Sequence, residues 1–211
     1  MTVEDVSCSD PQANLDRDER LLRAADLGEG GEVLRFWESP VPFIVLGRTC
    51  VAAEDVDLVA AADHGIPVLR RTSGGGTVLQ GPGCLSFALV LHKKRDLALE
   101  TINGTYRYVL ERVLKGLQTI GIDGAFRPVC DLALMSNDKK FSGNAQRRGR
   151  EHILHHGTLL YDFDLTLVTR CLKMPRKMPD YRGARAHDAF ITNVPADPAD
   201  LRRAIISQFI V

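Results

Sequence analysis

The 211-residue sequence lacks several features that would identify its partners at once. Lysine plus arginine and aspartate plus glutamate both number 27, so there is no cationic excess with which to collect a nucleic-acid backbone. No apolar run approaches the ~20 residues that cross a bilayer, and the longest, around residues 85–91, has the length of a strand. Residues 1–20 are polar and acidic and hold no apolar core of a signal peptide. We therefore expect a cytoplasmic protein whose partners are neither nucleic acid nor membrane.

Paired cysteines are also missing. The five cysteines are odd in number, widely scattered and without a CxxC pair: Cys8, Cys50, Cys84, Cys130 and Cys171. This pattern is typical neither of a disulfide framework nor of a structural zinc site. Two nucleotide-binding motifs, G-x-x-x-x-G-K-[ST] and the spaced G-x-G-x-x-G, are absent as well.

The hydrophobic pattern predicts helices and strands in mixed order. Helices are expected at residues 14–25, 56–64, 101–121, 165–172 and from 198 onward. Strands are expected at residues 33–37, 43–46, 66–70, 77–79, 85–91, 132–135, 140–142 and 157–161. Because there is no regular βαβ alternation, we predict an α+β fold, with one mostly antiparallel or mixed sheet and flanking helices. Residues 1–12 are expected to be a flexible leader, and residues 13–211 a single domain.

One segment, RRTSGGGTVLQGPGCLSFALVL at residues 70–91, stands out from the rest of the chain. The consecutive glycines Gly74, Gly75 and Gly76 lack Cβ atoms and tolerate positive φ, so their backbone N–H groups can approach a ligand closely. Arg70 and Arg71 can add charge-assisted hydrogen bonds to a carboxylate or phosphate. We expect an anionic small molecule here; the alternative is a glycine-rich turn between two strands.

A second unusual segment begins at residue 130 and reads CDLALMSNDKKFSGNAQRRGREHILHHGTLLYDFDL. A turn at Asn137 would present Lys140 at the start of the next strand, and residues 142–145 are small enough for a ligand to reach the backbone. A lysine beside a carboxylate or phosphate stabilises the negative charge that develops in a transition state. The alternatives are a solvated hairpin tip for Lys140 and its neighbour, and structural roles for His155 and His156.

In this order and at this separation, the two segments resemble the lipoate–protein ligase A family, within the biotin and lipoate protein ligase fold. The resemblance is carried by RRTSGGGTV at residues 70–78, DL at 131–132, KFSGNAQ at 140–146 and HGTLL at 156–160. The resemblance is supported by three further segments, NLDRDERLL, LRFWESPVPFIVLGR and ITNV. It extends over residues 14–194 of the chain.

The resemblance implies a ligase that works in two steps. The carboxylate of lipoate or octanoate attacks the α-phosphate of ATP to form an acyl-adenylate, and the acyl group then passes to a lysine of a lipoyl-domain acceptor protein. Lys140 would be the catalytic cation, in contact with the acyl carbonyl and the α-phosphate. The nucleotide- and acyl-binding residues that the resemblance implies are Arg70, Arg71, Ser73, Gly74, Gly75, Gly76, Thr77, Val78, Asp131, Ser142, Gly143, Asn144, Ala145, His156, Gly157 and Thr158. Mg²⁺ is expected with the triphosphate, and Asp131 is the candidate metal ligand.

Residues 80–84 depart from the family pattern, because QGPGC stands where ligases have a histidine–aspartate pair followed by glycine–asparagine. Cys84 is therefore a candidate nucleophile for an octanoyl or lipoyl transferase that uses a cysteine acyl-enzyme without ATP. A thiol inside an apolar strand is more often a core residue. A second transferase branch has its cysteine near the position of Arg182, where this chain has none. A further alternative is a non-catalytic lipoate-binding or docking protein.

The C-terminal part of the sequence raises two more expectations. Many relatives carry an accessory C-terminal domain, whereas this chain ends soon after Val194, so we expect no such domain and consider a separate accessory subunit. Residues 173–188 hold five Lys or Arg among prolines. They are a candidate mobile loop that closes over the adenylate or meets an acidic acceptor, the alternative being a solvated loop.

Overall fold

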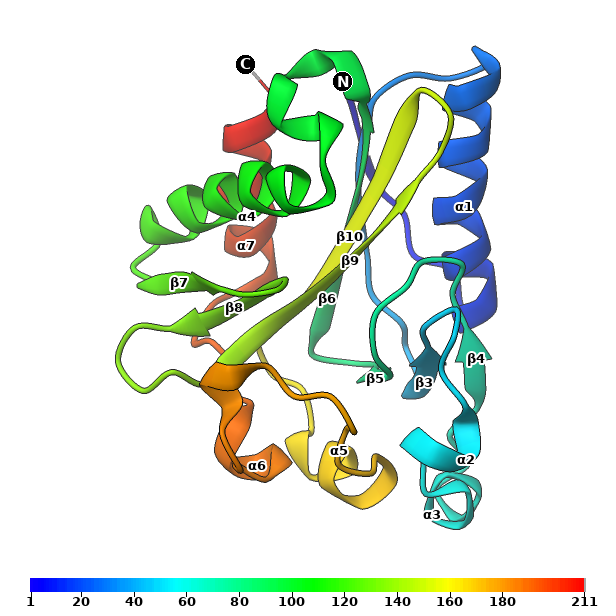
Figure 1. Cartoon of the computed structure of the whole chain (residues 1–211), viewed down its shortest axis with the longest axis vertical. Helices are drawn as coiled ribbons and strands as arrows, with labels where there is room; N and C mark the ends of the chain where they lie inside the picture. Colours follow the sequence, from blue (N-terminus) through cyan, green and yellow to red (C-terminus); the bar gives the residue numbers. More distant parts are fainter. Residues whose placement is uncertain (211) are drawn as a thin grey trace.

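A mixed seven-stranded sheet forms the centre of the computed structural model, which describes residues 1–210 (Figure 1). Its strands, in spatial order, are β1 (Thr2–Asp5), β2 (Val33–Trp37), β6 (Cys84–His92), β10 (His152–Leu160), β9 (Lys140–Arg148), β8 (Asp131–Leu134) and β7 (Gly124–Arg127). β1 runs parallel to β2, and the other neighbours are antiparallel. The α+β fold class and the mixed sheet are confirmed.

A second, three-stranded sheet lies beside the first and carries the glycine segment. Its strands are β4 (Val68–Arg70), β3 (Phe43–Leu46) and β5 (Val78–Gln80), with β3 parallel to β4 and antiparallel to β5. The helices are α1 (Pro11–Leu27), α2 (Ala52–Asp55), α3 (Leu58–Asp63), η1 (Lys93–Arg95), η2 (Leu97–Glu100), α4 (Ile102–Gln118), α5 (Leu165–Cys171), η3 (Asp180–Arg182), α6 (His187–Phe190) and α7 (Pro198–Phe209). In the part of the chain described, no helix is long and apolar enough to cross a membrane.

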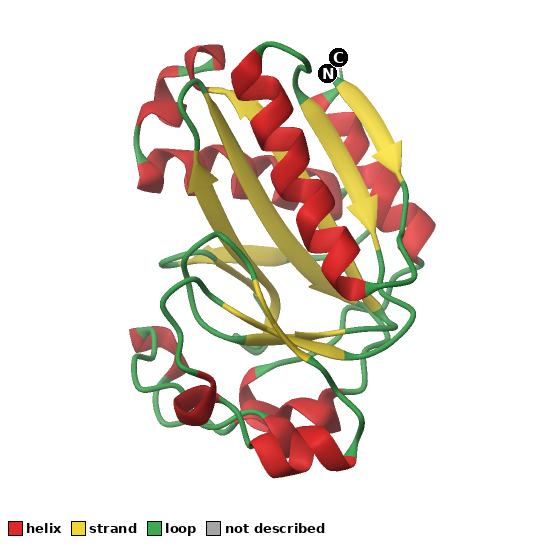
Figure 2. Cartoon of the chain, turned by 90° about the vertical axis from the view of Figure 1, so that its right-hand side faces the viewer, coloured by secondary structure: helices red, strands yellow, loops and turns green. Residues whose placement is uncertain are grey.

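Helices cover both faces of the large sheet, with α4 and α7 on one side and α1 on the other (Figures 1 and 2). α4 places Val109, Val113 and Leu117 on one stripe because these residues recur at helical spacing, and the stripe packs on the sheet with the buried Phe87. Each such side chain contributes about 1.5–3 kcal/mol on burial. The main core therefore lies on the face away from α1.

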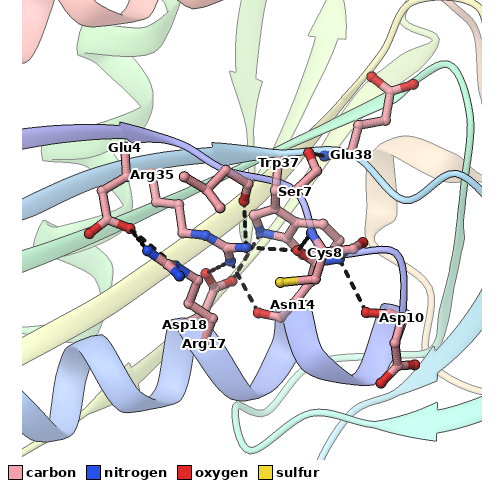
Figure 3. A network of polar contacts seen from close by, with 11 residues as sticks. Glu4, Ser7, Cys8, Asp10, Asn14, Arg17, Asp18, Arg35, Trp37 and Glu38 are labelled. Atoms are coloured by element: carbon pink, nitrogen blue, oxygen red, sulfur yellow. Dashed lines mark hydrogen bonds and ion pairs between the residues drawn. The ribbon is translucent and has the colours of Figure 1, made fainter.

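A buried polar network fastens α1 to β2 (Figure 3). The Arg35 guanidinium is fully buried and lies 2.5 Å from Asp18 Oδ1, 2.7 Å from Asn14 Oδ1 and 2.9 Å from the Val6 carbonyl oxygen. Trp37 Nε1 donates to the other Asp18 oxygen at 3.2 Å. Burial raises the pKa of Asp18 to about 6, although Arg35 opposes the shift. The NLDRDERLL motif, which contains Asn14 and Asp18, is thus part of the scaffold.

The expectation of a flexible leader over residues 1–12 is corrected by the structure. This segment contains β1, which pairs with β2, and the first two residues of α1, Pro11 and Gln12. The amide N–H of Thr2 donates to the Glu32 carbonyl at 2.9 Å, and that of Val6 donates to the Phe36 carbonyl at 3.2 Å. The strand is short and mostly exposed, so it leaves almost no hydrophobic signal; its order comes from backbone pairing with a neighbour.

The helix expected over residues 56–64 is replaced by two short helices, α2 and α3. Val56 is fully buried and forms an isolated β-bridge with Leu172, which interrupts the helical path. Asp57 then starts α3 by accepting a hydrogen bond from the Ala60 amide at 3.0 Å.

Other boundaries agree to different degrees. The strands expected at residues 33–37 and 43–46 are β2 and β3 without a change of limits. The strands expected at residues 140–142 and 157–161 correspond to parts of the nine-residue strands β9 and β10. The sequence did not indicate the full length of these strands, because each contains several polar residues. β7 and α6 were not predicted.

Candidate active site

The glycine segment forms a loop, residues 71–77, between β4 and β5 (Figure 1). It packs directly on Gly47, where a Cβ atom would overlap the Gly75 carbonyl oxygen and lie 2.9 Å from its carbonyl carbon. Gly75 itself has φ of 92°, in the region that favours glycine. The amide of Arg48 donates to the Ser73 carbonyl at 2.9 Å. Glycine is therefore required at two positions, one on each side of this contact.

Arg71 shapes the loop from inside. Its side chain is buried and donates to Ser73 Oγ at 3.0 Å and to the carbonyl oxygens of Gly74 and Gly76 at 2.8 Å each. A further bond to the Val45 carbonyl is 3.4 Å long. Burial lowers the pKa of Arg71, and the surrounding carbonyl groups take up its donors. The role that these contacts give Arg71 is to hold the loop in its bent form.

Arg70 acts in a similar way on the neighbouring turn. Its Nη1 atom donates to the carbonyl oxygens of Gly47, Arg48 and Cys50 at 2.9, 3.1 and 2.9 Å. The sequence suggested that Arg70 and Arg71 contact an anionic ligand. In the structure Arg71 and the Nη1 atom of Arg70 contact backbone carbonyl groups and so stabilise the loops that surround the site, while contact of either residue with an anionic ligand stays a prediction.

A serine–histidine hydrogen bond ties the loop to the large sheet. Ser73 Oγ lies 2.7 Å from Nε2 of His156 on β10. Although part of the ring surface remains exposed, the surrounding atoms desolvate it; this burial lowers the pKa of His156 to about 3, and Arg71 adds to the shift. The imidazole is therefore neutral at pH 7, and the tautomer of His156 sets which of the two groups donates in the hydrogen bond with Ser73 Oγ.

Lys140 stands opposite the loop at the start of β9. Its Nζ atom lies 2.7 Å from Asp131 Oδ1, and the hydroxyl of Tyr181 donates to Asp131 Oδ2, also at 2.7 Å. A Cβ atom at Gly143 would lie 3.0 Å from Lys140 Nζ, so the ammonium group is folded across β9 above this glycine. Asp131 is therefore held between a lysine and a tyrosine.

The glycine loop and Lys140 face the same side of β9. Gly143 and Ala145 are two residues apart on this strand and so share a face. A Cβ atom at Gly75 would lie 3.8 Å from the Ala145 Cβ atom, which places the loop over that face. Gly143 and Ala145 thus form the surface between the loop and Lys140. Because both residues are small, a ligand can approach the backbone of β9 there.

Asn144 and Ser142 alternate with these residues and lie on the opposite face, where both are buried. Asn144 Nδ2 donates to the Cys130 carbonyl at 2.9 Å and to Ser142 Oγ at 3.1 Å. Gly157 makes room for this side chain, since a Cβ atom there would lie 2.8 Å from Asn144 Cγ and 2.7 Å from Phe87 Cζ. Asn144, Ser142 and Gly157 therefore pack behind the candidate site.

The remaining residues implied by the resemblance border the loop or the strands. Thr77 Oγ1 donates to Asp55 Oδ2 at 2.5 Å and so links the loop to α2. Val78 packs with the aromatic cluster beneath α1, and Thr158 pairs with Ser86 on β6.

Two residues in the constellation were missed from the sequence, Gly47 and Tyr181. Gly47 lies in the supporting match before the glycine loop, so its motif context was a usable signal. Tyr181 lies 50 positions from its partner Asp131, inside the segment of residues 173–188, and nothing local indicates the contact.

Three of the five thiols are poorly placed for nucleophilic catalysis. Cys84 is 1% exposed in the core around β5 and α5, and burial raises its pKa to about 12. Cys171 is fully buried as well. Cys130 is half-buried next to Asp131, and burial, followed by this carboxylate, raises its pKa. Because the thiolate is the nucleophile, these environments disfavour an acyl-enzyme.

The side chains around Asp131 do not by themselves form a complete metal site. Residues 1–210 contain no group of three or more His, Cys, Asp or Glu side chains that could hold a metal ion. Both oxygens of Asp131 already accept, one from Lys140 and one from Tyr181. Protein side chains alone therefore do not enclose a metal at Asp131, and its role as one ligand of a Mg²⁺ shared with nucleotide phosphates stays a prediction.

Comparisons with known proteins identify the family. The lipoyl protein ligase A/B catalytic domain matches residues 10–209. The probable lipoate-protein ligase A of Mycoplasma pneumoniae is 30% identical over 184 residues, which are 87% of this chain and 52% of that protein. The octanoyltransferase LipM of Geobacillus kaustophilus is 27% identical over 188 residues, which are 79% of this chain and 67% of that protein.

Two solved structures have the same fold. A bi-partite lipoate protein ligase from Thermoplasma acidophilum gives a TM-score of 0.85 at 26% identity, over 99% of this chain and 81% of that one. A lipoate-protein ligase A bound with ATP gives 0.83 at 26% identity, over 99% and 83%. The chain spans about half the length of the ligase from Mycoplasma pneumoniae. With a match over nearly all of its residues, the chain belongs to the lipoyl protein ligase A/B catalytic-domain family.

Proposed function

We propose that the protein attaches lipoate or octanoate to a lysine of a lipoyl-domain acceptor through an acyl-adenylate made from ATP. The observation that carries this proposal is the position of Lys140, whose ammonium group lies over Gly143 and opposite the glycine loop. An acyl-adenylate has one phosphate charge beside a polarised acyl carbonyl. A single cation between the glycine loop and β9 can donate hydrogen bonds to both groups.

In the first step, a carboxylate oxygen of the acid forms a bond to the α-phosphorus and pyrophosphate leaves. In the second, the acceptor amine attacks the acyl carbonyl, loses a proton, and AMP leaves. Lys140 has three N–H bonds and uses one for Asp131, so two can point to the α-phosphate and the acyl carbonyl oxygen. Negative charge grows on these oxygens in the transition states, and a preorganised donor there contributes about 10²–10³ in rate.

The names of the relatives support this chemistry at two levels. Ligases and the octanoyltransferase LipM both occur among them, so transfer of an acyl group to a protein is common to the set. A relative solved with ATP supports a nucleotide in the first step. The buried state of Cys84 and the raised pKa of Cys130 favour the adenylate route over a cysteine acyl-enzyme.

The test is to incubate the protein with ATP, Mg²⁺, lipoate or octanoate and an apo lipoyl domain, omit each component in turn, and weigh the acceptor. Acyl-dependent exchange of pyrophosphate into ATP follows the first step separately. We expect Lys140→Ala to abolish exchange. Lys139→Ala removes the adjacent ammonium group, whose contact is the Asp188 carbonyl, and should leave exchange near wild type. Exchange that survives in Lys140→Ala would contradict the role of Lys140.

A transferase remains the second candidate because Cys130 lies beside Asp131 and Lys140 within the site. It predicts acyl transfer from a carrier protein without ATP, and a covalent adduct on Cys130 that mass spectrometry detects. If Cys130→Ser keeps the ATP-independent transfer of the wild type, or if the wild type transfers nothing without ATP, an acyl-enzyme at Cys130 is rejected. Binding of lipoate with neither reaction would indicate the non-catalytic alternative.

An accessory subunit is part of the same proposal. The relative from Thermoplasma acidophilum is described as bi-partite, with an E2 lipoyl domain in its lipoylation system. If this chain transfers acyl groups from a supplied acyl-adenylate but does not exchange pyrophosphate alone, a second polypeptide is required for activation. Exchange by the isolated chain would remove that requirement.

A further inference from the structure

Tyr181 contacts the site through Asp131. Its hydroxyl donates to Asp131 Oδ2 at 2.7 Å, while Lys140 Nζ lies 2.7 Å from Asp131 Oδ1. The carboxylate is 9% exposed, so solvent offers it few alternative partners. With one oxygen fixed by a phenol, the carboxylate cannot rotate freely, and the position of the other oxygen is set.

The orientation of Asp131 determines how Lys140 presents its charge. An ammonium group donates along three directions at once, so the direction of the bond to Asp131 determines where the other two N–H bonds point. The ammonium lies close above Gly143, and a displaced carboxylate would let this flexible side chain swing away from that position. A misplacement of about 1 Å at a reacting group can cost roughly 10²-fold in rate.

Tyr181 is itself held firmly, although its segment was expected to be a loop. Arg185 Nη2 donates to the Tyr181 carbonyl at 2.6 Å, and Arg185 Nη1 donates to the Asp138 carbonyl at 3.1 Å. The ring of Tyr181 packs on Phe190, with centroids 5.3 Å apart. Burial, and then Asp131, raise the pKa of the Tyr181 hydroxyl, so it remains protonated and can donate.

We propose that Tyr181 is a positioning residue for Lys140: its hydroxyl fixes the Asp131 carboxylate, which in turn directs the free N–H bonds of the lysine into the site. This inference rests on the proposed function, since it assigns a partner to the same cation. It differs from a simple anchoring role, in which Tyr181 would only hold residues 173–188 against the 131–140 hairpin.

Tyr181→Phe removes the hydroxyl and keeps the ring against Phe190. Tyr161→Phe is the matched control, because the Tyr161 hydroxyl also donates to a carboxylate, Glu38, at 3.0 and 2.9 Å. Arg185→Met tests anchoring alone, since it releases the bonds to Asp138 and to the backbone of Tyr181 but keeps the hydroxyl. Thermal unfolding of each variant confirms that it is folded.

Two measurements separate positioning from anchoring. The first is the determination of kcat and KM for acyl-dependent adenylate formation. Tyr181→Phe should lower kcat about tenfold, as expected for the loss of a hydrogen bond to a charged group, and should change KM little. The second is the affinity for an acyl-sulfamoyl adenosine, a stable mimic of the adenylate, in wild type, Tyr181→Phe, Lys140→Met and the double variant. The tyrosine change should weaken binding about tenfold when Lys140 is present and much less when it is methionine.

The inference is overturned if Tyr181→Phe matches wild type in kcat, if its effect on affinity is equal in both backgrounds, or if Arg185→Met produces the same loss of kcat at unchanged KM. Reduced kcat in Tyr161→Phe would also contradict it, because the effect would not be specific to Asp131. If wild type binds the mimic and forms adenylate while Tyr181→Phe is unchanged, only this inference fails. If wild type does neither, the proposed function fails.

Discussion

Replacing Gly47 by alanine should displace the glycine loop, because the added methyl group would overlap the backbone of Gly75. The new Cβ atom would lie 2.9 Å from the carbonyl carbon of Gly75 and closer still to its oxygen. Non-bonded carbons settle at about 3.5–4.0 Å. The neighbour is backbone and cannot rotate away, so Gly75 would have to move by roughly 1 Å to restore ordinary contact distances.

The loop resists such a movement because it is tied on several sides. Arg71 binds two of its carbonyl groups, and Ser73 is bonded to His156. We therefore expect two effects of Gly47→Ala. The strain of overpacking should lower the free energy of unfolding by about 1–3 kcal/mol. A loop wall moved by this distance should lower the rate of adenylate formation by about 10²-fold.

The assay is acyl-dependent pyrophosphate exchange, together with urea unfolding. Gly31→Ala is the control, because a Cβ atom there would meet nothing within 4 Å and the residue has no positive φ. It should match wild type in both measurements. If Gly47→Ala keeps wild-type exchange and stability, the close packing of the loop on Gly47 is not a requirement of the site, and the argument is refuted.

Three further predictions concern buried polar groups. Asp18→Asn leaves the Arg35 guanidinium buried without a carboxylate, so it should lower the free energy of unfolding by about 3–5 kcal/mol; a loss below 1 kcal/mol in urea unfolding would contradict this. Burial lowers the pKa of His156 from 6.5 to about 3, so the unfolded chain gains a proton below pH 6.5 that the folded chain does not. That part of the stability is present above pH 6.5 and lost as the pH falls. The unfolding free energy of wild type relative to His156→Gln, whose amide can donate to or accept from Ser73, should drop by roughly 2 kcal/mol between pH 7 and pH 5. Cys84→Ala should retain ATP-dependent acyl transfer, since burial raises the pKa of this thiol to about 12, and loss of activity in a folded variant would return Cys84 to consideration as a nucleophile.

The sequence determined the fold class and the two segments that form the candidate site. The strands at residues 33–37 and 43–46 were predictable because short apolar runs are bounded by turn residues, and the helix α4 because its apolar residues recur at helical spacing. The glycine motif and Lys140 could be singled out because their residue types are unusual in plain strands and turns. These signals are local, and a single sequence carries them in full.

The tertiary structure decided what those residues contact. Arg70 and Arg71 suggested ligand charges from the sequence, and the fold shows a further role, since Arg70 Nη1 and Arg71 Nη2 donate to backbone carbonyl groups that the packing of the loops brings around them. The order of β1 comes from pairing with a strand some thirty residues away, and the link from Tyr181 to Asp131 spans 50 residues. Contacts at such separations leave no periodic trace in the chain, because they depend on how whole elements pack. The sequence thus determines which chemical groups are available. Packing determines which of them face a ligand and which hold the others in place.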